Sequence, residues 1–270
     1  MQQDTIQLWT PQGVYPQDVA LPPETIFHIQ VNGEPLLNIA ASPTRPESLA
    51  VGFLYYSGII QHQEEIEVLH LSKEGTCIDI WLTHSLDEKT REPLLTSGCG
   101  RGVVLGGLYR PDTPLEDELR IHPERLITMM GTLQSNAHLY QQTRGVHSSA
   151  LFSPAGELLA LAEDIGRHNT LDKLLGLCLL EDLVSEGAIL LSTGRISSEM
   201  VSKAARMRAP IVGSLTAITS LAATLAEEWG MTTVGYVRGR GMQICTHPWR
   251  IAPTGPNAAI RTPNPLACSR

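Results

Sequence analysis

The feature that most constrains the fold is an alternation of helical and strand-like segments that begins at residue 123. The strand-like segments are GVHSSALFSP, ELLALAED, GAILLSTGR, APIVGSL and TTVGYV, and helical patterns such as NTLDKLLGLCLL and TSLAATLAEEWG separate several of them. Strands that alternate with helices of about 12 residues are typical of a sheet covered by helices. Residues 123–251 are therefore expected to form a three-layer α/β domain with a parallel sheet.

The preceding residues, 23–122, have a different pattern and predict a smaller β-rich part. ETIFHIQVNGEPLLNIAAS predicts two strands joined at Asn32-Gly33, a dipeptide typical of tight hairpin turns. TRPESLAVGFLYYSGII predicts a helix with Pro46 in its first turn. A second hairpin is expected in IEVLHLSKEGTCIDIWL. Residues 1–22 are predicted to be a loosely attached arm, and residues 252–270 a flexible tail.

Charge and hydropathy exclude several classes of partner. The chain has 20 Lys and Arg against 28 Asp and Glu, a net charge of −8, which argues against general nucleic-acid binding. The first residues show no secretory pattern, and no apolar run reaches the roughly 18 residues that a membrane span needs. We therefore expect a cytoplasmic protein that binds neither nucleic acid nor membrane.

The five cysteines are odd in number, lie far apart and show no CxxC spacing, so neither a disulfide framework nor a zinc site is expected. Cys77, Cys178 and Cys245 lie in apolar patterns and are predicted to be buried. Cys99 lies in the glycine-rich stretch LLTSGCGRGVVLGG. Such a loop suits either a thiol that a large partner must reach or a tight turn. Arg101 nearby would favour the reactive thiolate.

Three polar loops follow predicted strands: EDIGRHN, STGR and VRGRG. In open parallel sheets such loops gather at the carboxyl ends of the strands, where ligands bind. Glycines permit close backbone approach, and arginines bind phosphate bidentately, so Arg238 and Arg240 predict a phosphate or nucleotide site. Ordinary strand-to-helix turns would explain the first two loops equally well. The candidate residues of these loops are Asp164, His168, Asn169, Ser192, Thr193, Gly194, Arg195, Tyr236, Val237, Arg238, Gly239, Arg240 and Gly241.

Two histidines are further candidates for binding or catalysis. If a helix begins near Arg167, His168 and Asp172 lie one turn apart, so that Asp172 could orient the imidazole ring and raise its basicity. His147 lies beside a predicted strand, where a lone histidine is more often structural. The motifs GxxxxGK[ST], GxGxxG and HxE with PCxxC are absent, which argues against the commonest nucleotide sites and against zinc deamination.

Several segments occur together in an order that resembles the FdhD family, the formate dehydrogenase accessory sulfurtransferases. The segments are AVGFLYYSGII, SGCGRG, GVHSSAL, EDIGRHNTLDKLLG, STGRISSEMVSKAA, TSLAATLAEEWGMTTVGYVRGRG and THPWRI, over residues 49–251. The resemblance implies a cytidine-deaminase-like fold without the deaminase zinc residues. It also implies a cytoplasmic homodimer.

The resemblance further implies a reaction. A cysteine desulfurase would donate sulfur as a persulfide to Cys99, which matches the family's persulfide cysteine. The sulfur would pass to the molybdenum bis(molybdopterin guanine dinucleotide) cofactor, a bound substrate, before that cofactor enters formate dehydrogenase. Tyr236 to Gly241 match the family's cofactor-binding loop. Arg195 could hold phosphates of the cofactor, and Asp164, His168 and Asn169 could read its guanine or ribose edge, or position the sulfur.

The chain departs from the family at one position. Many members carry CxxC in the active loop, whereas Gly102 stands where the second cysteine would be. An internal disulfide of that pair is therefore impossible here, although a mechanism with one persulfide cysteine survives. Two alternatives stay open: a cofactor escort that moves no sulfur, and a hydrolase built on His168 and Asp172.

Overall fold

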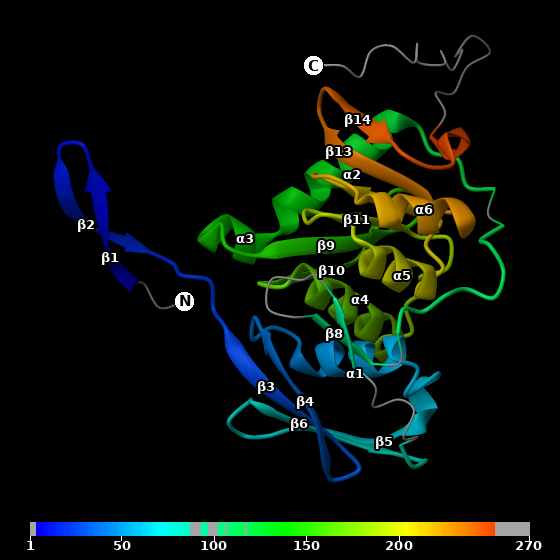
Figure 1. The fold of residues 1–270 in the computed structure, drawn as a ribbon. Coiled ribbons are helices and arrows are strands. Elements are labelled where there is room, and N and C mark those ends of the chain that lie inside the picture. Colours follow the sequence, from blue (N-terminus) through cyan, green and yellow to red (C-terminus); the bar gives the residue numbers. More distant parts are fainter. Residues whose placement is uncertain (1–3, 87–92, 97–101, 106, 117, 252–270) are drawn as a thin grey trace.

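The computed structural model describes residues 4–86, 93–96, 102–105, 107–116 and 118–251. Its largest element is a six-stranded sheet with the strand order β10-β9-β11-β12-β13-β14 (Figure 1). The strands are β9 (His147–Phe152), β10 (Leu158–Asp164), β11 (Ile189–Ser192), β12 (Ile211–Ser214), β13 (Thr232–Arg238) and β14 (Gly241–Ile244).

The prediction of a parallel sheet is only partly right. β11, β12 and β13 run parallel, but β9 is antiparallel to both β10 and β11, and β14 is antiparallel to β13. The reason lies in the connections. A tight turn ending at Gly156, whose φ is 91°, joins β9 to β10, and a short turn before Gly241 joins β13 to β14. Connections this short permit only antiparallel pairing.

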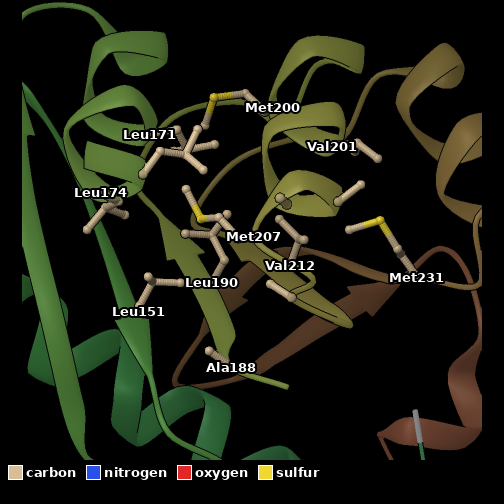
Figure 2. Close-up of a cluster of buried hydrophobic side chains, with 14 of the residues drawn as sticks. Leu151, Leu171, Leu174, Ala188, Leu190, Met200, Val201, Met207, Val212 and Met231 are labelled. Atoms are coloured by element: carbon tan, nitrogen blue, oxygen red, sulfur yellow. The ribbon is translucent and has the colours of Figure 1, made fainter. Parts of the chain in front are cut away.

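Helices cover both faces of this sheet, which confirms the three-layer architecture. Leu190 of β11 packs in one cluster with residues of α4 (Arg167–Leu180), α5 (Ser198–Arg206) and α6 (Ser220–Glu228) (Figure 2). The adjacent Ile189 packs in another cluster with Leu126 and Met130 of α2 (Pro123–Asn136), which α3 (His138–Thr143) follows. Neighbouring strand residues point to opposite faces, so β9, β10, β11 and β12 contribute to both clusters.

The predicted β-rich part contains a second, four-stranded sheet with the order β4-β3-β6-β5. It consists of β3 (Thr25–Val31), β4 (Glu34–Ala41), β5 (Ile66–Leu71) and β6 (Cys77–Leu82). Asn32 and Gly33 have φ of 54° and 80°, so the predicted hairpin turn is confirmed. Helix α1 (Pro46–Tyr56) supplies Leu49, Phe53 and Leu54 to the core beneath this sheet. Short 3-10 helices span Gln63–Glu65 and Pro248–Arg250.

Helices α1 and α4 join the two parts at very close range. A Cβ atom on Gly52 of α1 would lie 1.8 Å from the carbonyl oxygen of Asp172, and one on Gly176 of α4 would lie 1.9 Å from the carbonyl oxygen of Ser48. Only glycine permits such an approach of two backbones. The resulting helix pair places the beginning of α4 next to the end of β4.

The segment predicted as an N-terminal arm contains a hairpin of β1 (Asp4–Thr10) and β2 (Gly13–Val19). It projects from the rest of the molecule, and Trp9, Val14 and Tyr15 on it are exposed (Figure 1). β7 (Pro93–Thr96) pairs antiparallel with β8 (Gly102–Leu105). The predicted tail, residues 252–270, and the predicted sulfur carrier Cys99 lie outside the described residues.

Candidate functional site

The predicted ligand loops lie along one edge of the large sheet, as expected from the strand pattern. His147 at the start of β9 pairs with Asp164 at the end of β10, and Ser192 at the end of β11 pairs with Ser214 at the end of β12. Tyr236 near the end of β13 donates its backbone N–H to the carbonyl of Thr216 at 3.0 Å. This edge carries the candidate site.

The hydroxyl groups predicted to receive phosphate instead bind the protein itself. Ser192 is buried, and its Oγ accepts hydrogen bonds from Ser149 Oγ at 2.9 Å and from the backbone N–H of Gly194 at 3.2 Å. Thr193 Oγ1 accepts from the backbone N–H of Ser148 at 3.0 Å. In this structure these hydroxyls hold the β11–α5 loop against β9.

Asp164 and Asn169 likewise connect protein segments. Asp164 is fully buried, and its carboxylate accepts from the backbone N–H groups of Ser42 and Gly166 and lies 2.7 Å from Lys173 Nζ. Asn169 Nδ2 donates to Asp164 Oδ1 at 2.8 Å and to the carbonyl of Ala40 at 3.0 Å. The two side chains therefore fasten the start of α4 to the end of β4, and no ligand is needed to satisfy the carboxylate.

His168 is oriented by a residue that the sequence analysis missed. Helix α4 begins at Arg167, as predicted, but Asp172 binds Lys203 at 2.8 Å and does not orient the histidine. The partner of His168 is Glu199 of α5, whose Oε2 lies 3.0 Å from Nδ1. The expectation for Asp172 was wrong because a buried lysine from another helix attracts it more strongly than an imidazole does. The i,i+4 pair Glu199–Lys203 was the available signal.

Burial makes both histidines of the site weaker bases. Burial lowers the pKa of His168, and the nearby Glu199 carboxylate only partly opposes that shift. Burial also lowers the pKa of His147. The nearby Arg167 and His168 lower this pKa further, because a positive charge disfavours a second one. A Cβ on Gly194 would lie 2.9 Å from the Arg167 side chain and 3.3 Å from His147 Nδ1, so these groups crowd one place. Arg195, the next residue, is exposed.

The glycine and arginine loop borders a hollow of about 450 Å³ between α2 and the end of β13. Such a volume falls within the roughly 300–1,000 Å³ of small-molecule sites. Tyr236 has a φ of 51° and is 41% exposed, and Arg238 donates to the carbonyl of Leu215 at 3.3 Å. Arg240 is exposed in the turn that follows, and Gly241, the first residue of β14, is exposed as well. The hollow is lined by Ile127, Met130, Gly131, Gln134, Leu215, Val237, Arg238 and Gly239.

The cysteines that the structure describes are poor nucleophiles. Burial raises the pKa of the Cys178 thiol to about 11 and also raises the pKa of the Cys77 thiol. Cys77 and Cys178 are half-buried, whereas Cys245 is exposed, so its predicted burial was wrong. Cys245 directly follows the edge strand β14, which leaves its side chain uncovered.

The described part of the chain contains neither a cluster of metal ligands nor a helix that could cross a membrane. Within it, three or more His, Cys, Asp or Glu side chains nowhere gather in a way that could hold a metal ion. None of its helices combines the length and the apolar character that a membrane crossing requires.

The fold and the candidate site define a three-layer α/β protein with polar loops along one edge of its large sheet and an attached small sheet. Residues 22–252 match the FdhD/NarQ family, and the chain belongs to that family. It is 34% identical over 230 residues to a protein of Staphylococcus aureus named sulfur carrier protein FdhD, covering 83% of this chain and 86% of that one. A protein of Shouchella clausii with the same name is 34% identical, covering 92% of this chain and 97% of the relative.

A solved structure supports the same assignment. A crystal structure from Desulfotalea psychrophila, described as a formate dehydrogenase accessory protein, superimposes with a TM-score of 0.75 at 28% identity. The match covers 92% of this chain and 98% of that one. The similarity extends over the small sheet and the large one alike, so the relatives share the whole architecture.

Proposed function

We propose that the protein is a sulfur carrier that serves formate dehydrogenase. A cysteine desulfurase donates sulfur as a persulfide on Cys99, and the protein passes it to the molybdenum bis(molybdopterin guanine dinucleotide) substrate. The observation that carries the proposal is membership of a family whose relatives are named sulfur carriers, together with Cys99 between Gly98 and Gly100. We propose further that the protein acts in the cytoplasm as a homodimer.

The candidate site supports the binding of a large anionic substrate. The hollow beside β13 is lined by the apolar side chains of Ile127, Met130 and Val237, which suit the face of a purine, and by Arg238, which suits a phosphate. Arg195 and Arg240 add positive charge along the same edge in a chain of net charge −8. A local basic edge on an acidic protein favours a particular anion over polyanions in general.

The transfer chemistry needs only one cysteine. A thiolate attacks the sulfane sulfur of a donor persulfide by the displacement that also governs thiol–disulfide exchange. Because Gly102 stands in place of a second cysteine, no neighbouring thiol can attack the Cys99 persulfide and form an intramolecular disulfide. The persulfide therefore persists until the acceptor binds.

Mass spectrometry after incubation with a desulfurase and cysteine tests the proposal. We expect the Cys99 peptide to gain one sulfur atom, and Cys99→Ser to abolish the gain. Cys245→Ser, which removes an exposed thiol, is the matched control and should load normally. If the Cys99 peptide gains no sulfur while the Cys245 peptide does, Cys99 is not the carrier.

The alternative of an escort without sulfur transfer makes a different prediction. Both functions require binding of the guanine dinucleotide, so GDP should bind, and Arg238→Ala should weaken its binding by about tenfold, the effect of one charge-assisted contact. Isothermal titration measures this affinity, with Arg208→Ala, a surface arginine paired to Glu186, as the control. GDP binding without any sulfur on Cys99 would favour the escort.

A further inference from the structure

A buried chain of charged groups fixes the ring of His168. Its Nδ1 lies 3.0 Å from Glu199 Oε2, and Oε1 of the same carboxylate lies 3.0 Å from Lys203 Nζ. Lys203 also binds Asp172 at 2.8 Å, and all three charged partners are at least 96% buried at their side chains. A carboxylate kept ionised by a lysine accepts hydrogen bonds, so Nδ1 of a neutral ring must carry the hydrogen. Nε2 then presents a lone pair.

Both ring nitrogens of His168 are buried, and neither meets hydrogen-bond geometry with a described residue. Nδ1 has the Glu199 carboxylate at 3.0 Å, and Nε2 is the nitrogen that remains for a ligand. Buried polar atoms in folded proteins almost always have a partner, and an exception calls for an explanation such as a missing ligand. The ligand group that satisfies a lone pair must offer a hydrogen. An ionised phosphate offers only acceptor oxygens, so a phosphate does not fit at Nε2.

The charges around the ring indicate which kind of hydrogen donor binds at Nε2. Arg167 precedes His168 on α4, and Lys203 lies on α5 beside Glu199. His147 lies nearby on β9, and burial and the positive charge of Arg167 lower its pKa. Cations beside a lone pair stabilise a group that gives up a proton and becomes an anion. Of the donors that the proposed function brings to this edge, a sulfhydryl has this property, whereas the N–H edge of a nucleobase stays neutral.

We propose that His168 Nε2 is the proton acceptor for a sulfhydryl in the sulfur transfer, and that Glu199 is the positioning residue that fixes its ring. This inference rests on the proposed function. The S–H bond breaks as an N–H bond forms at Nε2, which leaves a thiolate and an imidazolium. The thiolate attacks the terminal sulfur of the donor persulfide, the S–S bond of the donor breaks, and the departing thiolate takes the proton from the imidazolium.

Imidazole nitrogen NMR on the unaltered protein tests the geometry directly. We expect His168 to be neutral at pH 7 with its hydrogen on Nδ1. A hydrogen on Nε2, or a charged ring at pH 7, would overturn the proposal. This measurement needs no variant and no sulfur on Cys99, so it stands even if the proposed function fails.

The rate of sulfur transfer from glutathione persulfide to the protein tests the role. His168→Gln should lower the rate at pH 7 by about 100-fold and remove the acidic limb of the pH profile, since a general base contributes about 10²–10⁴. Glu199→Gln should lower the transfer rate by about tenfold, the magnitude typical of groups that orient a histidine. It should also move the acidic limb of the pH profile to lower pH, because the ring loses its neighbouring carboxylate. His70→Gln, at an exposed histidine of β5, is the control. Unchanged pH profiles in the folded variants would refute the role.

Alkylation of Cys99 by iodoacetamide across pH tests whether the attacking thiol gives the proton. The donor persulfide keeps its own hydrogen in this step, so His168→Gln should move the midpoint of alkylation to higher pH. A midpoint that stays in place, even while transfer slows, would overturn the proposal. If transfer and alkylation both keep their wild-type profiles, His168 accepts no proton from sulfur.

Discussion

Asp164 illustrates, at the scale of single residues, how polar side chains in one loop divide between structure and chemistry. Its carboxylate is buried and occupied by Ser42, Gly166, Asn169 and Lys173, whereas His168, four positions on, keeps an unpartnered ring nitrogen among the described residues. The sequence EDIGRHNTLDK places both in one polar cluster and cannot separate them. Each side chain also has a partner that is distant in the chain, Ser42 for Asp164 and Glu199 for His168, and a local pattern does not encode such partners.

The buried Asp164–Lys173 pair supports a stability prediction. Lys173→Met leaves the carboxylate buried without its cation, so we expect the free energy of unfolding to fall by about 3–5 kcal/mol. Glu186→Gln, which breaks a surface pair with Arg208, should change it by less than about 1 kcal/mol. Urea unfolding measures both. Equal effects would show that the buried pair contributes no more than a solvated one.

The lowered pKa values of His147 and His168 predict how stability depends on pH. The unfolded chain binds protons at these rings below about pH 6.5, whereas the folded protein resists protonation. The free energy of unfolding should therefore fall as pH falls below about 6.5, by at most about 1.4 kcal/mol per pH unit for each ring. His168→Gln should make this slope shallower in urea melts at several pH values. An unchanged slope would show that His168 titrates alike in both states.

At the scale of elements, the crossing of α1 and α4 depends on two glycines that no local sequence pattern distinguishes from others. In a sequence, Gly52 and Gly176 are merely poor helix formers inside predicted helices. Their value comes from contact between segments more than 100 residues apart, where each accepts the partner's backbone. The same limit explains the strand directions. Local patterns predicted the strands, but the pairing depends on which connections are tight turns and which contain a helix.

Gly176→Ala should destabilise the protein although alanine is the better helix former. Its Cβ would lie 1.9 Å from the carbonyl oxygen of Ser48, so the helices must separate, at a cost of about 1–3 kcal/mol or more. The matched control is Gly131→Ala on α2, where nothing lies within 4 Å of the added Cβ. That exchange should stabilise by about 0.5–1 kcal/mol. Thermal unfolding distinguishes the two, and a stable Gly176→Ala protein would contradict the close packing.

At the scale of the whole molecule, the change of sequence pattern at residue 123 predicts a domain boundary. The two parts nevertheless share a buried interface between α1 and α4, which we call the joint. Helix α4 has Thr170 to Leu177 buried in an unbroken run, because α1 covers one side of it and the large sheet the other. Lys173 Nζ also donates to the carbonyl of Ser42 at 3.0 Å and to Thr44 Oγ1 at 3.1 Å. A boundary in sequence pattern is therefore not a boundary in packing.

This joint predicts that the two sheets unfold together. Separating them would expose the apolar faces of α1 and α4 and would remove the contacts of Ser42 with the Lys173 ammonium and the Asp164 carboxylate, so each part depends on buried contacts that the other supplies. Calorimetry of the whole chain should show one transition whose van't Hoff and calorimetric enthalpies agree. Residues 107–251 produced alone should lack the sharp side-chain spectrum of a packed core. Two separate transitions, or a well-packed fragment, would mean that α4 is stable without α1. The two parts would then be domains that fold independently and only associate at the joint.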